Sequence, residues 1–544
     1  MKDLIMNYSS LLEGDTVALC FFDGCSNATL TACLCTESAG RGLSYTVNER
    51  VLSAEFYYSQ TKNVGHRVVN FNYFKIELTE EMIYSSIKIT FGDSLSIATF
   101  SSFPIDKNAM SYYICGEHIL YFEGNSVILS PLKNAPLKKI KQNHRTAMKQ
   151  CFKKDKSGFI KALIIRLSHC LASPFFKKEI WLIADRKDVA GDNGESFFEY
   201  LSKNPQKGVK PYFVINKSSK DLKRIKKIGR VLHPRTFKYK LYFTFATRII
   251  ASQLEYDIVN PILARSYLKD ILNKCKVVFL QHGVTKDDVS KTYNRYERPI
   301  DIFTTVTRGE YQSIINNHAY GYGKEIVKLT GFSRFDKLES EREKIIFICP
   351  SWRKYCLKNT DTREPVDNVE DMRAVKLYRE LLTNNTLLSK AEILGYKLCF
   401  YPHYMMEKCF EGLDLSSPVF VNSHNYSYAD MFKKGALLMT DYSSVQFDFA
   451  YLKKPVIYCQ PDREEFFASH TYVEGYFEYE RDGFGEVCYD CDTLVSLLCD
   501  YIENDCKLKD EYKKRIDSTF KFRDKENCKR ILDEVLKLDN GKNN

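Results

Sequence analysis

Two adjacent hydroxyl groups interrupt an apolar part of the chain in a pattern that predicts anion binding. Ser443 and Ser444 lie between residues 436–439, an apolar run typical of a buried parallel strand, and residues 445–452, which are typical of a helix. At such a junction the first backbone N–H groups of the helix have no partner, and the helix dipole favours an anion. The spacing therefore predicts a phosphate-binding site. The alternative is that one serine only caps the helix.

Three further apolar runs end in polar residues of catalytic type. Each run is short enough to be a buried strand, so each polar group would lie at the carboxyl end of a strand. Because open parallel sheets bind ligands at that edge, the pattern predicts a cleft between two doubly wound domains. The runs and the residues that follow them are 277–280 with Gln281, His282 and Gly283; 347–349 with Pro350, Ser351, Trp352 and Arg353; and 398–401 with Pro402 and His403.

These motifs, in their order along the chain, resemble those of the CDP-glycerol glycerophosphotransferases, the polymerases of teichoic acids and capsules. The resemblance extends from about residue 178 to about residue 537. The chain departs from the family pattern at Val284, where Thr is expected, and at residues 331–333, where Gly-Asn-Pro or Gly-Tyr-Pro is more common. The motifs are His282-Gly283, Gly-Phe-Ser-Arg-Phe-Asp at 331–336, Pro-Ser-Trp-Arg at 350–353, Pro402-His403, and Thr-Asp-Tyr-Ser-Ser at 440–444 with Phe447-Asp448.

The resemblance implies a GT-B fold and a transfer of glycerol phosphate from CDP-glycerol to a hydroxyl of a growing teichoic-acid-like or capsule polymer, with release of CMP. The acceptor would be that polymer or a lipid-linked primer. Two alternatives stay open, a CDP-ribitol ribitolphosphotransferase and a GT-B glycosyltransferase that uses a nucleotide sugar. The resemblance also implies that His403 binds the donor pyrophosphate or stabilises the leaving group.

Such a transfer needs a seat for the pyrophosphate, a base for the acceptor hydroxyl, and positive charge for the departing CMP. His282 is the candidate base, because imidazole titrates near neutral pH and Gly283 lets the backbone turn close to a substrate. A lone histidine is more often a structural hydrogen-bonding group. The place of His282 after a buried strand, together with the resemblance, favours the catalytic interpretation.

The remaining candidates divide between the two halves. Asp448, about one helical turn after Ser444, would orient that segment or bind a donor hydroxyl. Arg353 offers a fork-shaped cation suited to phosphate, and Arg334 with Asp336 would serve the interdomain hinge or the donor. For both arginines a surface salt bridge is the alternative. We expect Arg353, Arg334, Thr440, Asp441, Tyr442, Ser443, Ser444 and Asp448 on the donor side, and Asp192, Asn193, Gln281 and Gly283 on the acceptor side.

Composition narrows the class of protein. A chain of 544 residues is too long for one core and predicts about three or four domains. Its 18 cysteines are scattered and no secretory signal precedes them, which predicts free thiols in a reducing cytosol. No apolar run reaches the roughly 20 residues that span a bilayer. No cluster of Asp, His or Cys predicts a metal, although Asp441 could bind a divalent cation such as Mg²⁺, which is left open.

The chain divides into segments of different character. Residues 1–132 predict a β-rich accessory domain, with acceptor-polymer binding, partner docking or homo-oligomerisation as candidate roles. Strands and helices alternate from residue 179, which predicts parallel sheets covered on both faces. We expect a Rossmann-like acceptor domain at 179–338, a Rossmann-like CDP-donor domain with terminal helices at 339–538, one of which often crosses back to the first half in such folds, and a tail at 539–544.

Residues 133–178 predict a basic amphipathic linker. Within it many lysines and arginines accompany a single acid, Asp155, and apolar residues recur at helical spacing. Such a helix can lie on an anionic membrane, which would make the protein cytoplasmic and peripheral on the inner face of the cell membrane. Alternatively, the stripe packs onto a sheet. Nucleic-acid binding is disfavoured, because no aromatic platform or motif accompanies the charge. The stripe is Ile160, Leu163, Ile164, Leu167 and Leu171.

Overall fold

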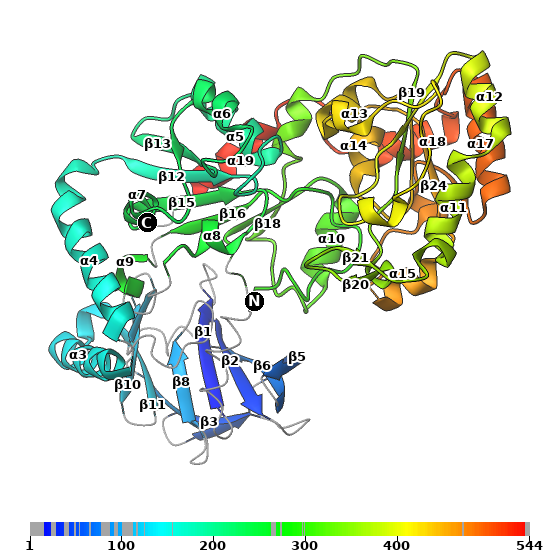
Figure 1. The fold of residues 1–544 in the computed structure, drawn as a ribbon. Coiled ribbons are helices and arrows are strands. Elements are labelled where there is room, and N and C mark those ends of the chain that lie inside the picture. The colour runs from blue at the N-terminus through cyan, green and yellow to red at the C-terminus, as the bar shows by residue number, and fades with distance from the viewer. Residues whose placement is uncertain are drawn as a thin grey trace.

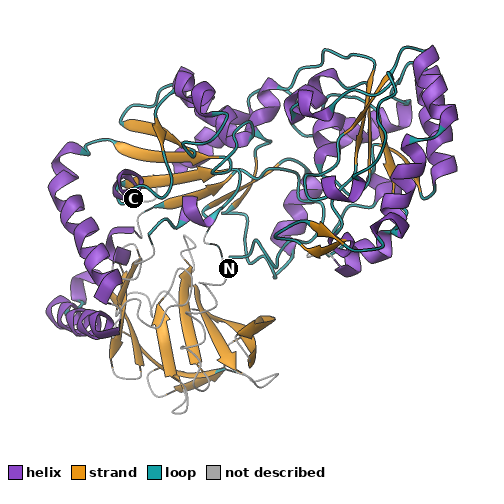
Figure 2. Ribbon diagram, in the orientation of Figure 1, coloured by secondary structure: helices purple, strands orange, loops and turns teal. Residues whose placement is uncertain are grey.

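The protein has a β-rich part, two connecting helices and two α/β parts, in that order along the chain (Figures 1 and 2). This arrangement confirms the fold class predicted from the sequence. The predicted tail at 539–544 lies outside the residues that the structure describes. The computed structural model describes residues 16–22, 29–36, 43–47, 50–53, 55–64, 67–77, 87–91, 96–100, 112–115, 118–123, 126–154, 156–262, 268–272, 275–295, 298, 300–469 and 473–538.

The N-terminal part consists of two sheets of short strands. The first has the order β5-β6-β2-β1-β8, and all its neighbours are antiparallel except β1 and β8. The second has the order β4-β3-β7-β11-β10-β9 and is antiparallel throughout. The strands are β1 (Thr16–Phe22), β2 (Thr29–Thr36), β3 (Ser44–Val47), β4 (Arg50–Ser53), β5 (Glu55–Val64), β6 (Arg67–Glu77), β7 (Ile87–Phe91), β8 (Ser96–Phe100), β9 (Tyr112–Cys115), β10 (His118–Glu123) and β11 (Ser126–Pro131).

Two consecutive helices, α3 (Leu137–Lys154) and α4 (Lys156–Ala172), join the β-rich part to the first α/β part (Figure 1). Ile140 of α3 packs in a small cluster of the β-rich part. Ala162 and Ile165 of α4 pack into the core of the first α/β part. The linker is therefore helical, as predicted, and it contacts the parts on both sides.

The predicted apolar stripe of α4 faces away from the sheet. The sequence left two interpretations of this stripe, packing onto a sheet or contact with a membrane. The structure rules out the first, because only Ala162 and Ile165 of this helix are buried. The stripe residues are exposed: Ile160 at 53%, Leu163 at 43%, Ile164 at 49%, Leu167 at 56% and Leu171 at 77%.

Seven parallel strands in the order β14-β13-β12-β15-β16-β17-β18 form the sheet of the first α/β part. The strand order reverses between β12 and β15, and ligands of open α/β sheets bind at the carboxyl ends of strands at such a point. The strands are β12 (Glu179–Ala184), β13 (Val209–Val214), β14 (Val231–Leu232), β15 (Ala246–Ala251), β16 (Lys276–Phe279), β17 (Ile302–Thr305) and β18 (Val327–Leu329). The helices are α5 (Asn193–Lys203), α6 (Leu222–Ile228), α7 (Phe237–Phe243), α8 (Tyr256–Val259), α9 (Lys269–Leu272) and α10 (Arg308–Asn316).

The second α/β part has a five-stranded parallel sheet in the order β22-β19-β23-β24-β25, which reverses between β19 and β23. Its strands are β19 (Ile345–Cys349), β22 (Lys397–Phe400), β23 (Leu437–Thr440), β24 (Val456–Cys459) and β25 (Gly485–Cys488), with a separate hairpin of β20 (Leu357–Asn359) and β21 (Glu364–Pro365). Its helices are α11 (Arg373–Leu382), α12 (Asn385–Ile393), α13 (Tyr428–Lys434), α14 (Val445–Tyr451), α15 (Arg463–Ser469), α16 (Tyr479–Asp482), α17 (Cys491–Glu503) and α18 (Asp510–Thr519).

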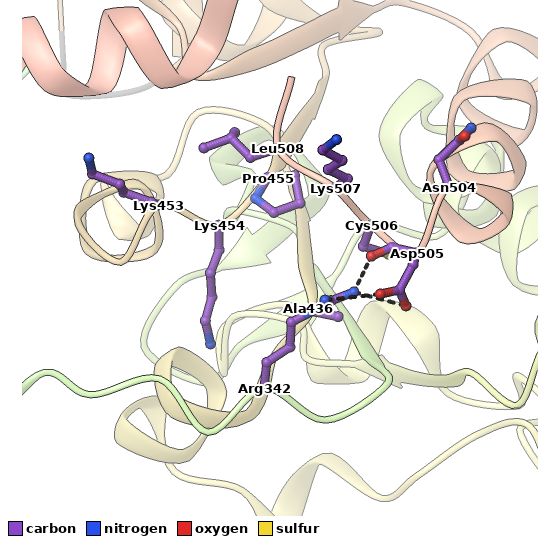
Figure 3. Close-up of a pocket in the computed structure, with 10 residues that line it drawn as sticks. All are labelled: Arg342, Ala436, Lys453, Lys454, Pro455, Asn504, Asp505, Cys506, Lys507 and Leu508. Carbon is purple, nitrogen blue, oxygen red and sulfur yellow. Dashed lines mark hydrogen bonds and ion pairs between the residues drawn. The ribbon is translucent and has the colours of Figure 1, made fainter. Parts of the chain in front are cut away.

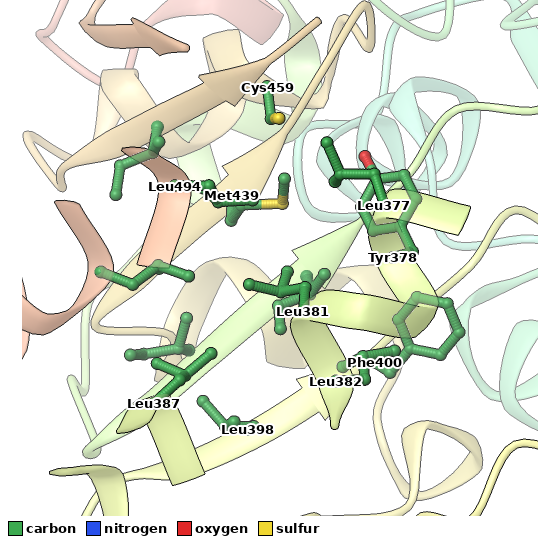
Figure 4. Packing of buried hydrophobic residues seen from close by; sticks show 14 of the residues in the cluster. Leu377, Tyr378, Leu381, Leu382, Leu387, Leu398, Phe400, Met439, Cys459 and Leu494 are labelled. Atoms are coloured by element: carbon green, nitrogen blue, oxygen red, sulfur yellow. The ribbon is translucent and has the colours of Figure 1, made fainter. Parts of the chain in front are cut away.

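Helices α11, α12 and α17 cover one face of the second sheet (Figures 1 and 4). Leu381 of α11, Leu387 of α12 and Leu494 of α17 lie in one buried cluster with Leu398 and Met439 of the strands. Each fully buried leucine contributes about 1.5–3 kcal/mol. The cluster therefore fixes the sheet whose carboxyl edge carries His403 and Ser444.

The last helix, α19 (Asn527–Lys537), returns to the first α/β part (Figure 1). Its Ile531 and Leu532 lie in one core cluster with Trp181 of β12. The carboxylate of Asp336 fixes the start of this helix, because it accepts hydrogen bonds from the backbone nitrogens of Asn527 (2.9 Å) and Cys528 (2.8 Å). The sequence predicted this crossover, and the structure confirms it.

Among the helices of the described residues, none combines the length and the hydropathy needed to cross a bilayer. Cys349, Cys399 and Cys459, which the sequence places inside apolar runs, are buried free thiols.

Candidate active site

The carboxyl ends of the two sheets approach each other at His282 and Ser444. His282 and Gly283 follow β16 of the first sheet, and Ser443 and Ser444 follow β23 of the second. A Cβ atom on Gly283 would lie 2.4 Å from Ser444 Oγ, so a larger residue here would require the Ser444 side chain to shift. The structure thus brings together two motifs that lie far apart in the sequence.

A buried polar network holds the turn that carries His282. Gln281 has a left-handed backbone (φ 58°) and is 2% exposed. Its amide nitrogen donates to Glu310 Oε1 (2.9 Å), and its amide oxygen accepts from Thr285 Oγ1 (2.6 Å). Glu310, on α10, also accepts from the backbone nitrogens of Thr285 (2.7 Å) and Val306 (2.6 Å). The turn is therefore fixed on both sides of His282.

Glu310 was not among the predicted site residues, although the sequence marks it as part of a helix start. Thr307 is the N-cap of α10 and its hydroxyl accepts from the backbone nitrogen of Glu310 (3.1 Å). A threonine followed three residues later by glutamate is a usual helix start. Here the glutamate side chain is fully buried and burial raises the pKa of Glu310 to about 7, although its hydrogen bonds oppose that rise.

The surroundings keep both histidines neutral at physiological pH. The His282 side chain is exposed to solvent. Desolvation by the protein atoms near its ring, with the positive charges of Arg186 and Arg334, lowers the pKa of His282 to about 4. Desolvation and Arg186 also lower the pKa of His403 to about 4, against the opposing effect of Asp441. A neutral imidazole can accept a proton, as a general base must.

His403 carries its proton on the outer ring nitrogen. The backbone nitrogen of Met405 donates to His403 Nδ1 (3.3 Å), so in the neutral ring Nδ1 is the acceptor and Nε2 bears the hydrogen. His403 can therefore donate one hydrogen bond from Nε2, and a phosphate oxygen could accept it.

Arg334 joins the two halves of the site. Its Nε and Nη2 donate to both carboxylate oxygens of Asp448 (2.7 and 2.8 Å), and its Nη1 donates to Asp192 Oδ1 (2.7 Å). Burial disfavours the charge, but the two carboxylates raise the pKa of Arg334. The Asn193 side chain accepts from the Arg334 backbone nitrogen (3.1 Å) and donates to the Gln281 carbonyl (2.8 Å). These contacts form an interdomain clamp of four predicted site residues, whose substrate contacts stay predictions: Arg334, Asp192, Asp448 and Asn193.

The loop between β12 and α5 is anchored by Asp185, which sequence reasoning passed over. Its carboxylate is 2% exposed, accepts from Ser252 Oγ (2.5 Å), and accepts from the backbone nitrogens of Gly191, Asp192, Gly194 and Glu195 at 2.7–3.2 Å. The anchor fixes Asp192 and Asn193 where α5 begins.

Arg353, a predicted donor ligand, is 1% exposed and lies between two carboxylates. Its Nε and Nη2 donate to Asp462 (2.7 and 3.0 Å), and its Nη1 donates to Asp441 Oδ2 (2.7 Å). Asp441 also accepts from the Ser351 backbone nitrogen (3.0 Å). Asp462 follows β24, and the strand-end criterion applied to the other motifs would have found it. This buried triad holds the strand end that carries Ser443 and Ser444.

Thr440 and Tyr442 also hold the strand end that carries Ser443 and Ser444. The hydroxyl of Thr440 donates to the Cys349 carbonyl (2.8 Å), and the Tyr442 ring stacks on Phe466 at 4.1 Å. Within the predicted motif at 440–444, only the two serines are partly exposed. Ser444 is the N-cap of α14, yet its side chain makes no capping hydrogen bond. The serines are thus the residues of this motif that a ligand can reach, and donor contact by the other three stays a prediction.

A cavity of about 320 Å³ in the second part lies elsewhere (Figure 3). Its lining includes Ala436 and Pro455, which directly precede β23 and β24. It therefore opens at the amino ends of the strands, the opposite edge from Ser444. In the part of the chain that the structure describes, no group of three or more His, Cys, Asp or Glu side chains is arranged to hold a metal ion.

Residues 164–537 match the family described as CDP-Glycerol:Poly(glycerophosphate) glycerophosphotransferase. The chain belongs to this family. The resemblance drawn from the motifs is thereby confirmed.

The relatives are teichoic acid proteins of Bacillus. The chain is 35% identical over 443 residues to the minor teichoic acid biosynthesis protein GgaB of Bacillus subtilis, a match that covers 79% of this chain and 48% of GgaB. It is 22% identical over 334 residues to the teichoic acid poly(glycerol phosphate) polymerase of Bacillus spizizenii. This match covers 56% of this chain and 79% of that polymerase. A solved structure of the wall teichoic acid polymerase TagF is 16% identical, covers 72% of this chain and 98% of that one, and has a TM-score of 0.49. The chain thus spans about half the length of GgaB.

We expect Glu310→Gln to remove a pH-dependent part of the stability. Because the pKa of Glu310 rises from 4.5 to about 7 on folding, its contribution is full below about pH 4.5 and is lost as the pH rises through about 7. This shift corresponds to about 3 kcal/mol in the free energy of unfolding. Urea unfolding between pH 4.5 and 8 should show a steeper loss for the wild type than for the variant.

Glu325→Gln is the matched control, because Glu325 is an exposed carboxylate of the same α/β part. Its unfolding free energy should follow the wild type at every pH. Parallel pH profiles for the wild type and Glu310→Gln would contradict the assignment of Glu310.

Proposed function

We propose that the protein transfers glycerol phosphate from CDP-glycerol to a hydroxyl of a teichoic-acid-like or capsule polymer and releases CMP. The observation that carries the proposal is the approach of the His282 turn to Ser444, with Gly283 between them. The turn that carries His282 in one half therefore lies against Ser444 of the other half. Membership of the family supports the donor, since its description names CDP-glycerol.

In the proposed reaction His282 takes the proton of the acceptor hydroxyl. The acceptor oxygen then attacks the phosphorus that carries glycerol, and the bond from that phosphorus to the bridging oxygen breaks. CMP leaves with the bridging oxygen, and a phosphodiester remains on the polymer. Ser443, Ser444 and the Nε2–H of His403 are the proposed hydrogen-bond donors to the pyrophosphate. Phosphoryl transfer depends chiefly on positioning and electrostatics, so this set of groups is sufficient.

We also propose that α4 holds the enzyme on an anionic membrane surface. The stripe defined above is exposed, and exposed lysines such as Lys156 and Lys161 lie on the same helix. Apolar side chains can enter the lipid interface while each nearby cation contributes about 1 kcal/mol with anionic headgroups. This arrangement would bring the site close to a lipid-linked acceptor.

A panel of donors tests the reaction. Purified protein with acceptor is given CDP-glycerol, CDP-ribitol or a nucleotide sugar, and nucleotide release and polymer linkage are measured. We expect CMP release and a new phosphodiester with CDP-glycerol. Faster release from CDP-ribitol would make the donor assignment wrong, and a product linked through a sugar carbon would overturn phosphate transfer altogether.

Substitutions in the two halves should have different kinetic effects. His282→Ala should lower turnover by about 10²- to 10⁴-fold while donor binding is retained, because a general base is lost. Ser444→Ala should chiefly weaken donor binding, by roughly 1.5–3 kcal/mol, because one charge-assisted phosphate contact is lost. His318→Ala, at an exposed histidine after α10, is the control.

Thermal melts must first show that all three variants are folded. Near-normal turnover in His282→Ala would refute its role as the base, and Asp192 or Asp448 would then be the next candidates.

Membrane binding is tested by co-sedimentation with anionic vesicles at low and high salt. We expect the wild type to bind at low salt and less at high salt, because salt screens the charges. The double variant Ile164→Glu and Leu167→Glu should lose binding. Ile393→Glu is the matched control, since Ile393 is 79% exposed on α12 of the other α/β part. Equal binding of the two variants would exclude α4 as the contact.

A further inference from the structure

We propose that Arg186 is a further phosphate-binding residue of this site, whose guanidinium binds the phosphoryl group that lies between His282 and His403. The inference rests on the proposed function for the identity of the donor. It does not depend on whether glycerol or ribitol is transferred, because both donors carry the same pyrophosphate.

The position of Arg186 in the first sheet is the first argument. Arg186 follows β12 at its carboxyl end, and Gln253 follows β15 at the same edge. These are the two strands between which the strand order reverses (Figure 1). In open α/β sheets this is the point where ligands bind. Arg186 is also exposed, so a ligand can reach it.

The second argument is how the guanidinium is held. With the Gln253 amide oriented so that its oxygen faces Arg186, that oxygen accepts from Nη2 (2.8 Å) and Nε (3.1 Å). The Arg186 backbone nitrogen also donates to the Val189 carbonyl (3.2 Å). A neutral amide thus orients one edge of the guanidinium without cancelling its charge, and Nη1 remains for a ligand.

The third argument compares the arginines of the site. Arg334 is neutralised by Asp192 and Asp448, and Arg353 by Asp441 and Asp462. Among the residues that the structure describes, no carboxylate forms an ion pair with Arg186. A cation that binds a phosphate must keep its charge available, and of these three arginines Arg186 alone does so.

The fourth argument is the reach of its charge across the junction. The positive charge of Arg186 contributes to lowering the pKa of His282 in the first half and of His403 in the second. It also acts on Tyr428, at the start of α13 in the second half. A cation whose charge acts on both histidines is well placed to bind a phosphoryl group that lies between them.

Binding of inorganic pyrophosphate, measured by calorimetry at low salt, tests the proposal without any donor. We expect Arg186→Gln to bind pyrophosphate roughly 10- to 100-fold more weakly than the wild type, because a charge-assisted contact is lost. Arg186→Lys should recover part of the affinity, since it restores the charge but not the fork. Arg373→Gln, at an exposed arginine of the second half, is the control.

A second readout separates binding from a structural role. In ligand-free Arg186→Gln, NMR titration should show the pKa of His282 and of His403 moved up toward 6.5, with an unchanged thermal melt. Equal pyrophosphate affinity in the wild type and Arg186→Gln would overturn the proposal. If the wild type binds pyrophosphate through Arg186 yet releases no CMP from CDP-glycerol, the proposed donor fails while Arg186 stands.

Discussion

The ion pairs of Arg334 with Asp192 and Asp448 are the interaction on which the site depends. Asp192 lies at the start of α5 in the first half, and Asp448 lies on α14 in the second. The Arg334 side chain is only 11% exposed, so its desolvation is offset only if every donor finds an acceptor. Both carboxylates provide such acceptors at 2.7–2.8 Å. The clamp therefore holds the two halves at a fixed separation. At this separation Gly283, the residue after His282, lies against Ser444.

The clamp also sets the position of His282, the proposed base. Asn193 accepts from the Arg334 backbone nitrogen and donates to the carbonyl of Gln281. The turn that carries His282 is thus tied on one side to the interdomain ion pairs and on the other to Glu310 of α10. The charged residues consequently fall into two classes. Buried cations with two aspartates each support the geometry, and an exposed cation without a carboxylate is available for a ligand.

Much of the fold could be predicted, because its signals are local in the sequence. Apolar runs such as 345–349 and 437–440 are typical of strands covered on both faces, and helical spacing marked the α4 stripe. The strand-end criterion located His282, His403 and Ser444. It could not separate residues that a ligand can reach from residues that support them. Arg353 satisfies the same criterion as Ser444, but it is paired with Asp462, which lies 109 positions away. Arg186 was passed over for the same reason, since its lack of a carboxylate partner is a property of the folded chain.

The charges near His282 link its pKa to the binding of a pyrophosphate. Desolvation and then the positive charges of Arg186 and Arg334 disfavour a proton on His282 and lower its pKa to about 4. An imidazole with so low a pKa is neutral at pH 7 but has little affinity for a proton. A pyrophosphate that binds at Arg186, as proposed above, would bring negative charge, which cancels part of this field and raises the pKa of the ring beside it. By Coulomb's law the arrival of the proposed donor would therefore strengthen His282 as the proposed base. The proposed phosphate-binding charge of Arg186 and the proposed base would in this way be coupled through one electrostatic field.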